Sequence, residues 1–219
     1  MKKITMRDVI VFAVALLAPQ ITQGQGTMTY LSNLGQASAG SLAVGSDSWL
    51  ATRFFTGTNA GGYVLDSIQL GMADASGNPS GFTVMLYSSL IIAIRPGSSL
   101  GTLNGSLNPV TSGIYTYTPD SSLTLPAYTY YYIVLTAGTT VANGAYEWSY
   151  AGVNSYNRSG GWFSLGPVVT SSNGSSWNSI SGAYPQFAIN ATPVPEPSPS
   201  FLLLLGSGIF IYVRRAFHR

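Results

Sequence analysis

The stretch YVLDSIQLGM, residues 63–72, carries the pattern that decides the fold class. Successive side chains of an extended chain point to opposite faces. Two sets of residues would then face opposite sides, with Val64, Asp66 and Ile68 on one and Leu65, Ser67 and Gln69 on the other. A short run rich in β-branched and aromatic residues, bounded by glycines, predicts a β-strand.

Six further runs repeat this composition. They are WLATRFFT (49–56), FTVMLYS (82–88), IYTYT (114–118), YTYYYIVLTA (128–137), AYEWSY (145–150) and PQFAIN (185–190). The intervening GTNAGG, DASGNPSG, RPGSSLGTLNG and SSNGSSWNS are typical of turns and loops. This spacing predicts one all-β domain over residues 27–192, a β-sandwich of jelly-roll type, with an open barrel as the alternative.

Charge is scarce in this domain. Only 7% of the chain is charged, against about 25% in ordinary soluble domains. Between residues 27 and 192 the acids are Asp47, Asp66, Asp74, Asp120 and Glu147, and the bases are Arg53, Arg95 and Arg158. A nucleic-acid-binding protein needs a basic stripe to neutralise phosphates, so we expect no nucleic acid partner.

The N-terminal residues have the order of a secretory signal peptide. Lys2, Lys3 and Arg7 precede the apolar stretch VIVFAVALLA (9–18), and small and polar residues follow. The apolar stretch is shorter than the about 20 residues of an ordinary membrane span. We therefore predict a signal peptide over residues 1–24, removed after Gly24, with an uncut N-terminal anchor as the alternative.

The C-terminal residues form three successive parts. Prolines at alternate positions from Pro193 to Pro199 predict an extended linker over residues 193–200. The thirteen uncharged residues 201–213 would span about 20 Å as a helix, short of the about 30 Å hydrocarbon core. Arg214 and Arg215 would act as a cytoplasmic stop. We expect a short transmembrane helix and basic tail over residues 201–219, with a buried core strand as the alternative.

The same three parts resemble a known sorting signal. Val194, Pro195, Glu196 and Pro197, then the hydrophobic run and Arg214-Arg215, resemble the PEP-CTERM signal of exopolysaccharide-producing Gram-negative bacteria, also labelled the ice-binding protein C-terminal segment. The resemblance covers about the last 26 residues. It implies that an exosortase in the membrane cuts near the Pro-Glu-Pro motif, and releases or re-attaches the exported domain.

The domain itself resembles the choice-of-anchor R type. FFTGTNAGGYVLDSIQLGM (54–72) and SSLTLPAYTYYYIVLTAG (121–138) carry this resemblance. It implies a surface β domain without an established biochemical activity, and it transfers no site. The predicted signal peptide and the resemblance of the tail imply export through the inner membrane, transient anchoring, and a final place on the cell surface or in the extracellular matrix.

Catalytic residues are few. The only histidine is His218, in the tail, and there is no cysteine, so the domain holds neither a Ser-His-Asp triad nor a cysteine nucleophile. A carboxylate pair for glycoside hydrolysis stays open, although Asp74 and Asp120 lie in turn sequences. A calcium loop at residues 74–78 is less favoured than a hairpin turn. We predict no enzyme, no metal and no cofactor.

Aromatic residues are the most informative group for binding. Tyrosine and tryptophan offer flat apolar faces on which sugar rings stack. Trp162 and Trp177, both in loop-like sequences, are the candidate glycan contacts, and Tyr128, Tyr130 and Tyr132 would share one strand face. We expect a non-catalytic surface or exopolysaccharide-matrix protein. The alternatives are a carbohydrate-binding module, an ice-binding module, which the lack of Thr-x-Thr ladders disfavours, and a glycan-active enzyme.

Overall fold

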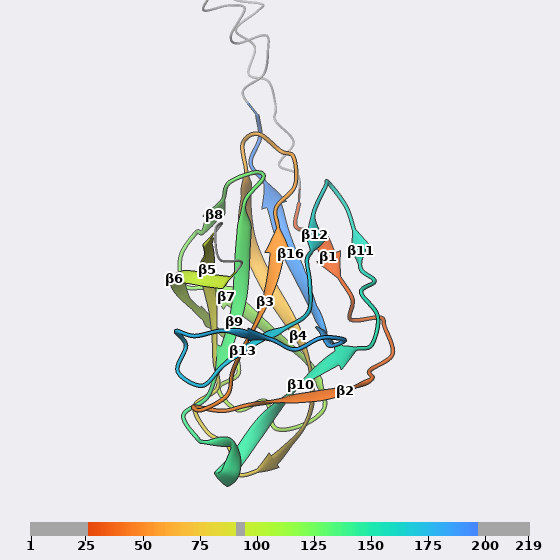
Figure 1. The fold of residues 1–219 in the computed structure, drawn as a ribbon. Coiled ribbons are helices and arrows are strands. Elements are labelled where there is room, and N and C mark those ends of the chain that lie inside the picture. Colours follow the sequence, from red (N-terminus) through yellow and green to blue (C-terminus); the bar gives the residue numbers. More distant parts are fainter. Residues whose placement is uncertain (1–25, 91–94, 197–219) are drawn as a thin grey trace, which may run out of the picture.

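The computed structural model describes residues 26–90 and 95–196 (Figure 1). The described residues form strands joined by turns and one short 3-10 helix, η1 (Val141–Asn143). The longer strands are β1 (Met28–Ser32), β2 (Gly40–Val44), β3 (Trp49–Phe55), β4 (Tyr63–Gly77), β5 (Thr83–Leu90), β6 (Arg95–Asn104), β7 (Gly113–Pro119), β9 (Tyr130–Thr136), β10 (Gly144–Ala151) and β16 (Phe187–Pro193). Shorter strands are β8 (Thr124–Leu125), β11 (Asn157–Arg158), β12 (Phe163–Ser164), β13 (Val169–Ser171), β14 (Asn178–Ser179) and β15 (Tyr184–Pro185).

The strands form one curled antiparallel sheet. Neighbouring strands follow the order β11-β1-β16-β4-β7-β6-β5-β9-β3-β13-β14, and β10 extends the sheet beside β4 and β2. The sheet turns at a short β6–β7 junction, where Leu103 pairs with Pro119 and Asn104 with Thr118. Its two halves therefore lie over each other like the layers of a sandwich (Figure 1). The predicted all-β class is confirmed.

The main core lies between the two halves. One half contributes Ile68 and Leu70 of β4 with Phe187 and Ile189 of β16, and the other contributes Leu50 and Phe54 of β3 with Ile133 and Leu135 of β9. A smaller apolar cluster covers the outer face of β3 and β9. It consists of Ala51, Tyr132, Val134 and Val169, with Trp49, Met85, Tyr87 and Trp177 packed against it.

The predicted alternation in residues 63–72 is wrong because of a β-bulge. Asn190 of β16 pairs with Ser67, and the next residue, Ala191, pairs with Leu65, so Asp66 is an extra residue. A bulge exchanges the two faces of a strand beyond it. Tyr63 and Leu65 are consequently buried before the bulge, and Ile68, Leu70 and Met72 are buried after it. Thr192 donates a hydrogen bond of 2.8 Å to the Asp66 carboxylate at this point.

Two segments predicted as loops belong partly or almost wholly to strands. DASGNPSG was expected to break the chain, yet β4 continues to Gly77 and pairs with β10. RPGSSLGTLNG (95–105) contains the whole of β6, which pairs with β5 and is mostly exposed. The backbone supplies the hydrogen bonds of a β-ladder, so an exposed strand can consist of polar side chains and leave little hydrophobic pattern in the sequence.

The C-terminal linker starts later than predicted. Pro193 is the last residue of β16 and pairs with Tyr63 of β4. The predicted signal peptide at residues 1–24, the predicted linker from Pro197 and the predicted transmembrane helix and tail at residues 201–219 lie outside the described residues. Among the residues that the structure does describe, no helix has the length and apolar character needed to cross a membrane.

Candidate ligand-binding surface

Three strands place aromatic side chains next to one another on the outer face of the sheet. In β3, Phe54 points into the core while Phe55 is half-exposed, as alternation requires. Tyr130 of β9 and Phe163 of β12 both pair with Phe55, one on each side. The ring centroids of Phe55 lie 4.6 Å from those of Tyr130 and of Phe163, and Phe163 is stacked at 26°. Together with Tyr128, these three residues form what we call the aromatic platform.

Tyr128 extends the platform into solvent. Its side chain is 63% exposed, and its ring centroid lies 6.4 Å from that of Phe55. Its φ is +54°, and among the described residues no other non-glycine residue has a positive φ. This conformation costs a bulky residue on the order of 1–2 kcal/mol. Backbone strain that the surrounding structure maintains is typical of functional positions.

The turn that carries Tyr128 is held by specific hydrogen bonds. The Thr56 hydroxyl accepts a bond of 2.9 Å from Thr129 N and donates one of 2.7 Å to the Pro126 carbonyl. Tyr128 N donates to the Gly57 carbonyl at 3.1 Å. The exposed ring is therefore carried on an ordered turn, which lowers the entropy that a ligand must remove on binding.

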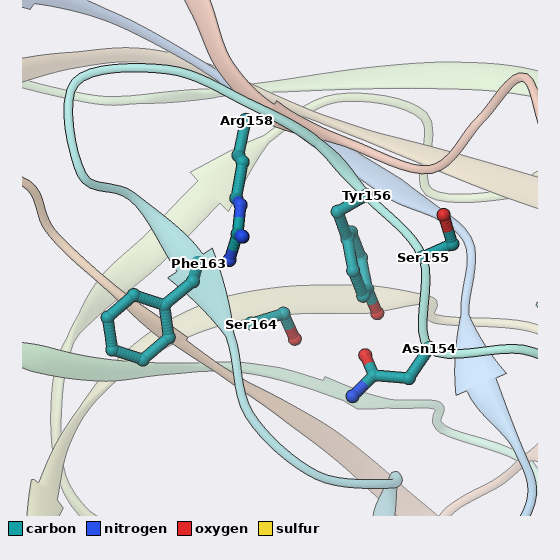
Figure 2. Close-up of a pocket in the computed structure, with 6 residues that line it drawn as sticks. All are labelled: Asn154, Ser155, Tyr156, Arg158, Phe163 and Ser164. Carbon is teal, nitrogen blue, oxygen red and sulfur yellow. The ribbon is translucent and has the colours of Figure 1, made fainter.

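A polar pocket of about 240 Å³ adjoins the platform at Phe163. It is lined by Asn154, Ser155, Tyr156, Arg158, Phe163 and Ser164. In Figure 2, Arg158 and Tyr156 project from the same chain segment toward Ser164, while the Phe163 ring points away from Ser164. Its volume is below the ~300–1,000 Å³ typical of sites that enclose a whole drug-sized ligand, so it fits one unit of a larger molecule.

The Tyr156 phenol at this pocket is neutral at physiological pH. Burial raises the pKa of Tyr156 to about 12, while the nearby Ser164 hydroxyl acts in the opposite direction. The Tyr156 hydroxyl oxygen is enclosed and has no hydrogen-bond partner among the described residues. Ser164 itself donates to the Arg53 carbonyl at 2.9 Å. An enclosed hydroxyl without a partner is a polar group that a ligand or a water molecule is able to satisfy.

The prediction that Trp162 contacts a glycan is wrong. Its side chain is 0% exposed and stacks between Tyr30, at 5.1 Å, and Phe54, at 5.9 Å. Gly160 and Gly161 both have positive φ, so the glycine-rich turn folds the indole into the core and presents the next residue, Phe163, outward. The loop-like sequence suggested exposure, but it supplied the conformations that allow burial.

Trp177, the second predicted contact, lies apart from the pocket-lining residues. It is half-buried, immediately before β14, and packs against the smaller apolar cluster on the outer face of β3 and β9. The platform residues that sequence reasoning missed are Phe55 and Phe163. Tyr130 and Tyr132 share the outer face of β9 as predicted, but Tyr132 is buried as part of the smaller apolar cluster and does not join the platform.

The aspartates occupy separate structural positions. Asp47 accepts from Val141 N at 2.9 Å, and Asp120 accepts from the Asn104 amide. Asp74 lies within β4 rather than in the predicted turn, and accepts from Ser112 N at 2.7 Å. Within residues 26–90 and 95–196, no three metal-binding side chains gather around a common point.

The predicted sorting motif begins in contact with the domain. Asn59 donates its side-chain amide to the Val194 carbonyl at 2.9 Å, and Val194 N donates to the Gly62 carbonyl at 3.0 Å. The Glu196 carboxylate accepts from Ala60 N at 2.9 Å, and Pro195 is exposed. We call residues 57–62 the rim loop. Pro197, Arg214 and Arg215 lie outside the described residues.

Comparison with known proteins finds a likeness in structure only. No family model matches the chain, and no curated protein matches it. A solved structure of the cysteine protease and lectin-like domains of Cwp84, a surface layer associated protein of Clostridium difficile, superposes with a TM-score of 0.50 at 14% sequence identity. The match covers 76% of this chain and 36% of that one, so it supports the all-β fold alone.

Proposed function

We propose that this chain is an exported, non-catalytic protein of the cell surface or exopolysaccharide matrix. Its jelly-roll-like domain, residues 27–192, lies outside the inner membrane, and the PEP-CTERM signal retains it in the membrane until an exosortase acts. The signal peptide directs export, and the hydrophobic run with Arg214 and Arg215 stops it. The domain then reaches the surface or the matrix.

The observation that carries this proposal is the place where the motif leaves the domain. Val194, directly after the end of β16, contacts the rim loop, and the next two residues, Pro195 and Glu196, are exposed. Figure 1 shows the end of β16 at one tip of the domain, beside the loop between β3 and β4. A protease needs an accessible backbone outside regular structure, and the residues after Pro193 offer it.

Cell fractionation tests the proposal. Expressed in a host without exosortase, the full chain is expected in the membrane fraction, and a chain ending at Glu196 is expected in the soluble exported fraction. A chain that ends at Glu196 keeps the hydrogen bonds of Val194 and Glu196 to the rim loop, so we expect the truncation to leave the fold of the domain unchanged. A truncated chain that remains with membranes would contradict the assignment of residues 197–219.

Carbohydrate binding is the second candidate function, and the aromatic platform favours it. Sugar rings stack on aromatic faces, and hydroxyl and amide side chains at the rim bind their hydroxyl groups. The platform offers stacked, half-exposed rings beside a pocket lined by Asn154, Ser155 and Ser164. The Cwp84 structure also contains a domain described as lectin-like, in a surface layer associated protein.

A glycan array with matched variants tests this role. The full chain, in mild detergent, is expected to bind one class of polysaccharide, and Tyr128→Ala to weaken that binding at least tenfold, since stacking contributes about 1–3 kcal/mol per ring. Trp177→Ala is the control, because Trp177 packs against the smaller apolar cluster and is not part of the aromatic platform. Equal binding by wild type and Tyr128→Ala would exclude the platform as the contact surface.

A further inference from the structure

We propose that the aromatic platform and its pocket bind an anionic polysaccharide, one whose sugar units carry carboxylate groups, in preference to a neutral one. This inference rests on the carbohydrate-binding role proposed above, and specifies its ligand. It follows from where the few charged residues of the domain are placed.

Two of the three positive charges of the domain lie at this surface. Residues 27–192 contain three arginines, no lysine and five acids. Arg53 lies on the platform and Arg158 lines the pocket. The four aspartates have partners in other parts of the fold. A domain with an excess of acids thus presents a local positive surface, and opposite charge favours an anionic partner.

Arg53 is fixed against an aromatic ring. Its guanidinium carbon lies 4.9 Å from the centroid of Tyr130, within the range of a cation–π contact. Its Nε is buried and has no hydrogen-bond partner among the described residues. The charge of Arg53 also lowers the pKa of Tyr132, opposing the larger rise caused by burial. The positive charge of Arg53 is therefore held at the base of the platform.

Arg158 provides the directional contact. It is exposed, follows Tyr156 by two residues, and extends into the pocket beside Phe163 (Figure 2). A guanidinium presents planar N–H donors that match the two oxygens of a carboxylate. A sugar ring stacked on Phe163 would direct a carboxylate on its edge toward Arg158, and its hydroxyls toward Asn154 and Ser164. The remaining sugar units of the polysaccharide would extend over Tyr128.

The choice of ligand class is supported by the nature of the pocket. Its volume of about 240 Å³ fits one unit of a longer polymer, and the platform beside it is open to solvent. A single arginine among hydroxyl and amide groups fits a singly charged sugar better than a densely charged phosphate polymer, which needs several basic residues. The proposed ligand is thus a uronate-type polysaccharide.

Polygalacturonate and its methyl ester are the matched probes. Methyl esterification removes the charge and leaves the sugar backbone unchanged. With the full chain in mild detergent, titration calorimetry is expected to give at least tenfold tighter binding to polygalacturonate than to the ester. Arg158→Gln is expected to remove most of this difference, because a hydrogen bond to a charged group contributes the equivalent of about a tenfold change in affinity.

Arg95→Gln is the control for net charge. Arg95 is also exposed, but lies at the start of β6 and does not line the pocket. The Arg95→Gln variant is expected to bind both probes with the affinities of the wild type. Circular dichroism and a thermal melt of each variant confirm that the fold is retained, and a second pocket variant, Arg158→Lys, is expected to restore part of the preference.

The outcomes separate this inference from the proposed role. Binding of both probes with equal affinity, lost in Tyr128→Ala, would overturn the anionic preference and leave carbohydrate binding standing. Equal losses in Arg158→Gln and Arg95→Gln would show non-specific attraction, and also overturn the inference. No binding to either probe, and none on a glycan array, would overturn both.

Discussion

Tryptophan 162 shows how a single residue was assigned to the wrong place by its local sequence. SGGWFS gives no sign of which aromatic residue turns inward, because two flexible glycines allow either arrangement. The pairing of Phe163 with Phe55 of β3 settles the question, and this contact joins residues more than a hundred positions apart. Residue type alone predicted that aromatic residues lie at the surface, but which of them do so depends on the fold.

We expect Trp162→Ala to be among the most destabilising substitutions. The indole is fully buried and contacts Tyr30, Phe54 and Tyr63, so its removal should lower the free energy of unfolding by about 3–5 kcal/mol. Trp162→Phe should cost much less, because it keeps a stacked ring and removes an indole N–H that has no partner among the described residues. Denaturant unfolding of the full chain measures both.

Trp177→Ala serves as the comparison, since that side chain is only half-buried. A loss in Trp162→Ala no larger than in Trp177→Ala would contradict the packing described.

Tyr128→Gly is expected to separate stability from binding. Glycine adopts φ of +54° without strain, which offsets the entropy that it adds to the unfolded chain. The free energy of unfolding should therefore stay within about 1 kcal/mol of wild type, whereas glycan affinity should fall at least tenfold with the loss of the exposed ring. Tyr128→Phe, the matched control, keeps the ring and the strain. A destabilisation of several kcal/mol in Tyr128→Gly would mean that the ring supports the fold.

At the scale of elements, hydrophobic pattern predicted the buried strands and missed the polar ones. The run 128–137 contains β9 as expected, because Ile133, Val134 and Leu135 are buried on both sheet faces. β6 was missed because Ser98, Ser99 and Leu100 are exposed on a strand that needs no apolar face. The bulge at Asp66 was also missed, since it depends on pairing with β16.

The rim loop is expected to protect the start of the sorting motif. Asn59 holds the Val194 carbonyl, and a Cβ at Gly61 would lie 2.6 Å from that oxygen, so the two chains approach closely. Asn59→Ala should raise the rate at which a broad-specificity protease cuts after Pro193 about fivefold, since a lost hydrogen bond contributes about 1 kcal/mol. Mass spectrometry of the early fragments locates the cut.

Asn154→Ala is the control, because Asn154 is exposed and lies in the pocket, not at the rim loop. Cleavage at the same rate in wild type and Asn59→Ala would mean that these hydrogen bonds do not restrain the motif.

At the scale of the whole molecule, the sequence predicted the all-β fold class but not which residues form the aromatic platform. Runs of β-branched and aromatic residues separated by Gly-, Pro- and Asn-rich segments predicted an all-β domain, and this is confirmed. The platform was not predictable, because Phe55, Tyr130 and Phe163 become neighbours only after β9 and β12 flank β3. Because the domain contains many tyrosines and no lysine or cysteine, its tyrosines determine how its stability changes at alkaline pH.

Stability is expected to fall as pH rises above about 10. Burial raises the pKa of Tyr30, Tyr117, Tyr131, Tyr132, Tyr146 and Tyr156 above the ordinary 10.0, that of Tyr156 to about 12. The unfolded chain therefore releases these protons at lower pH than the folded domain does. The stabilisation is complete below pH 10 and is lost as pH rises through the folded values. With no lysine or cysteine in the domain, tyrosines dominate this range.

Denaturant unfolding of the full chain from pH 8 to 12 measures the effect, and tyrosinate absorbance follows the titration directly. Tyr156→Phe should make the decline in unfolding free energy above pH 10 shallower, because it removes one group whose proton the fold retains. Tyr128→Phe, which removes a phenol from an exposed side chain, is the matched control. A flat profile up to pH 12 would mean that these phenols titrate alike in the folded and unfolded chain. It would contradict the burial of these tyrosines in the core and of Tyr156 at the polar pocket.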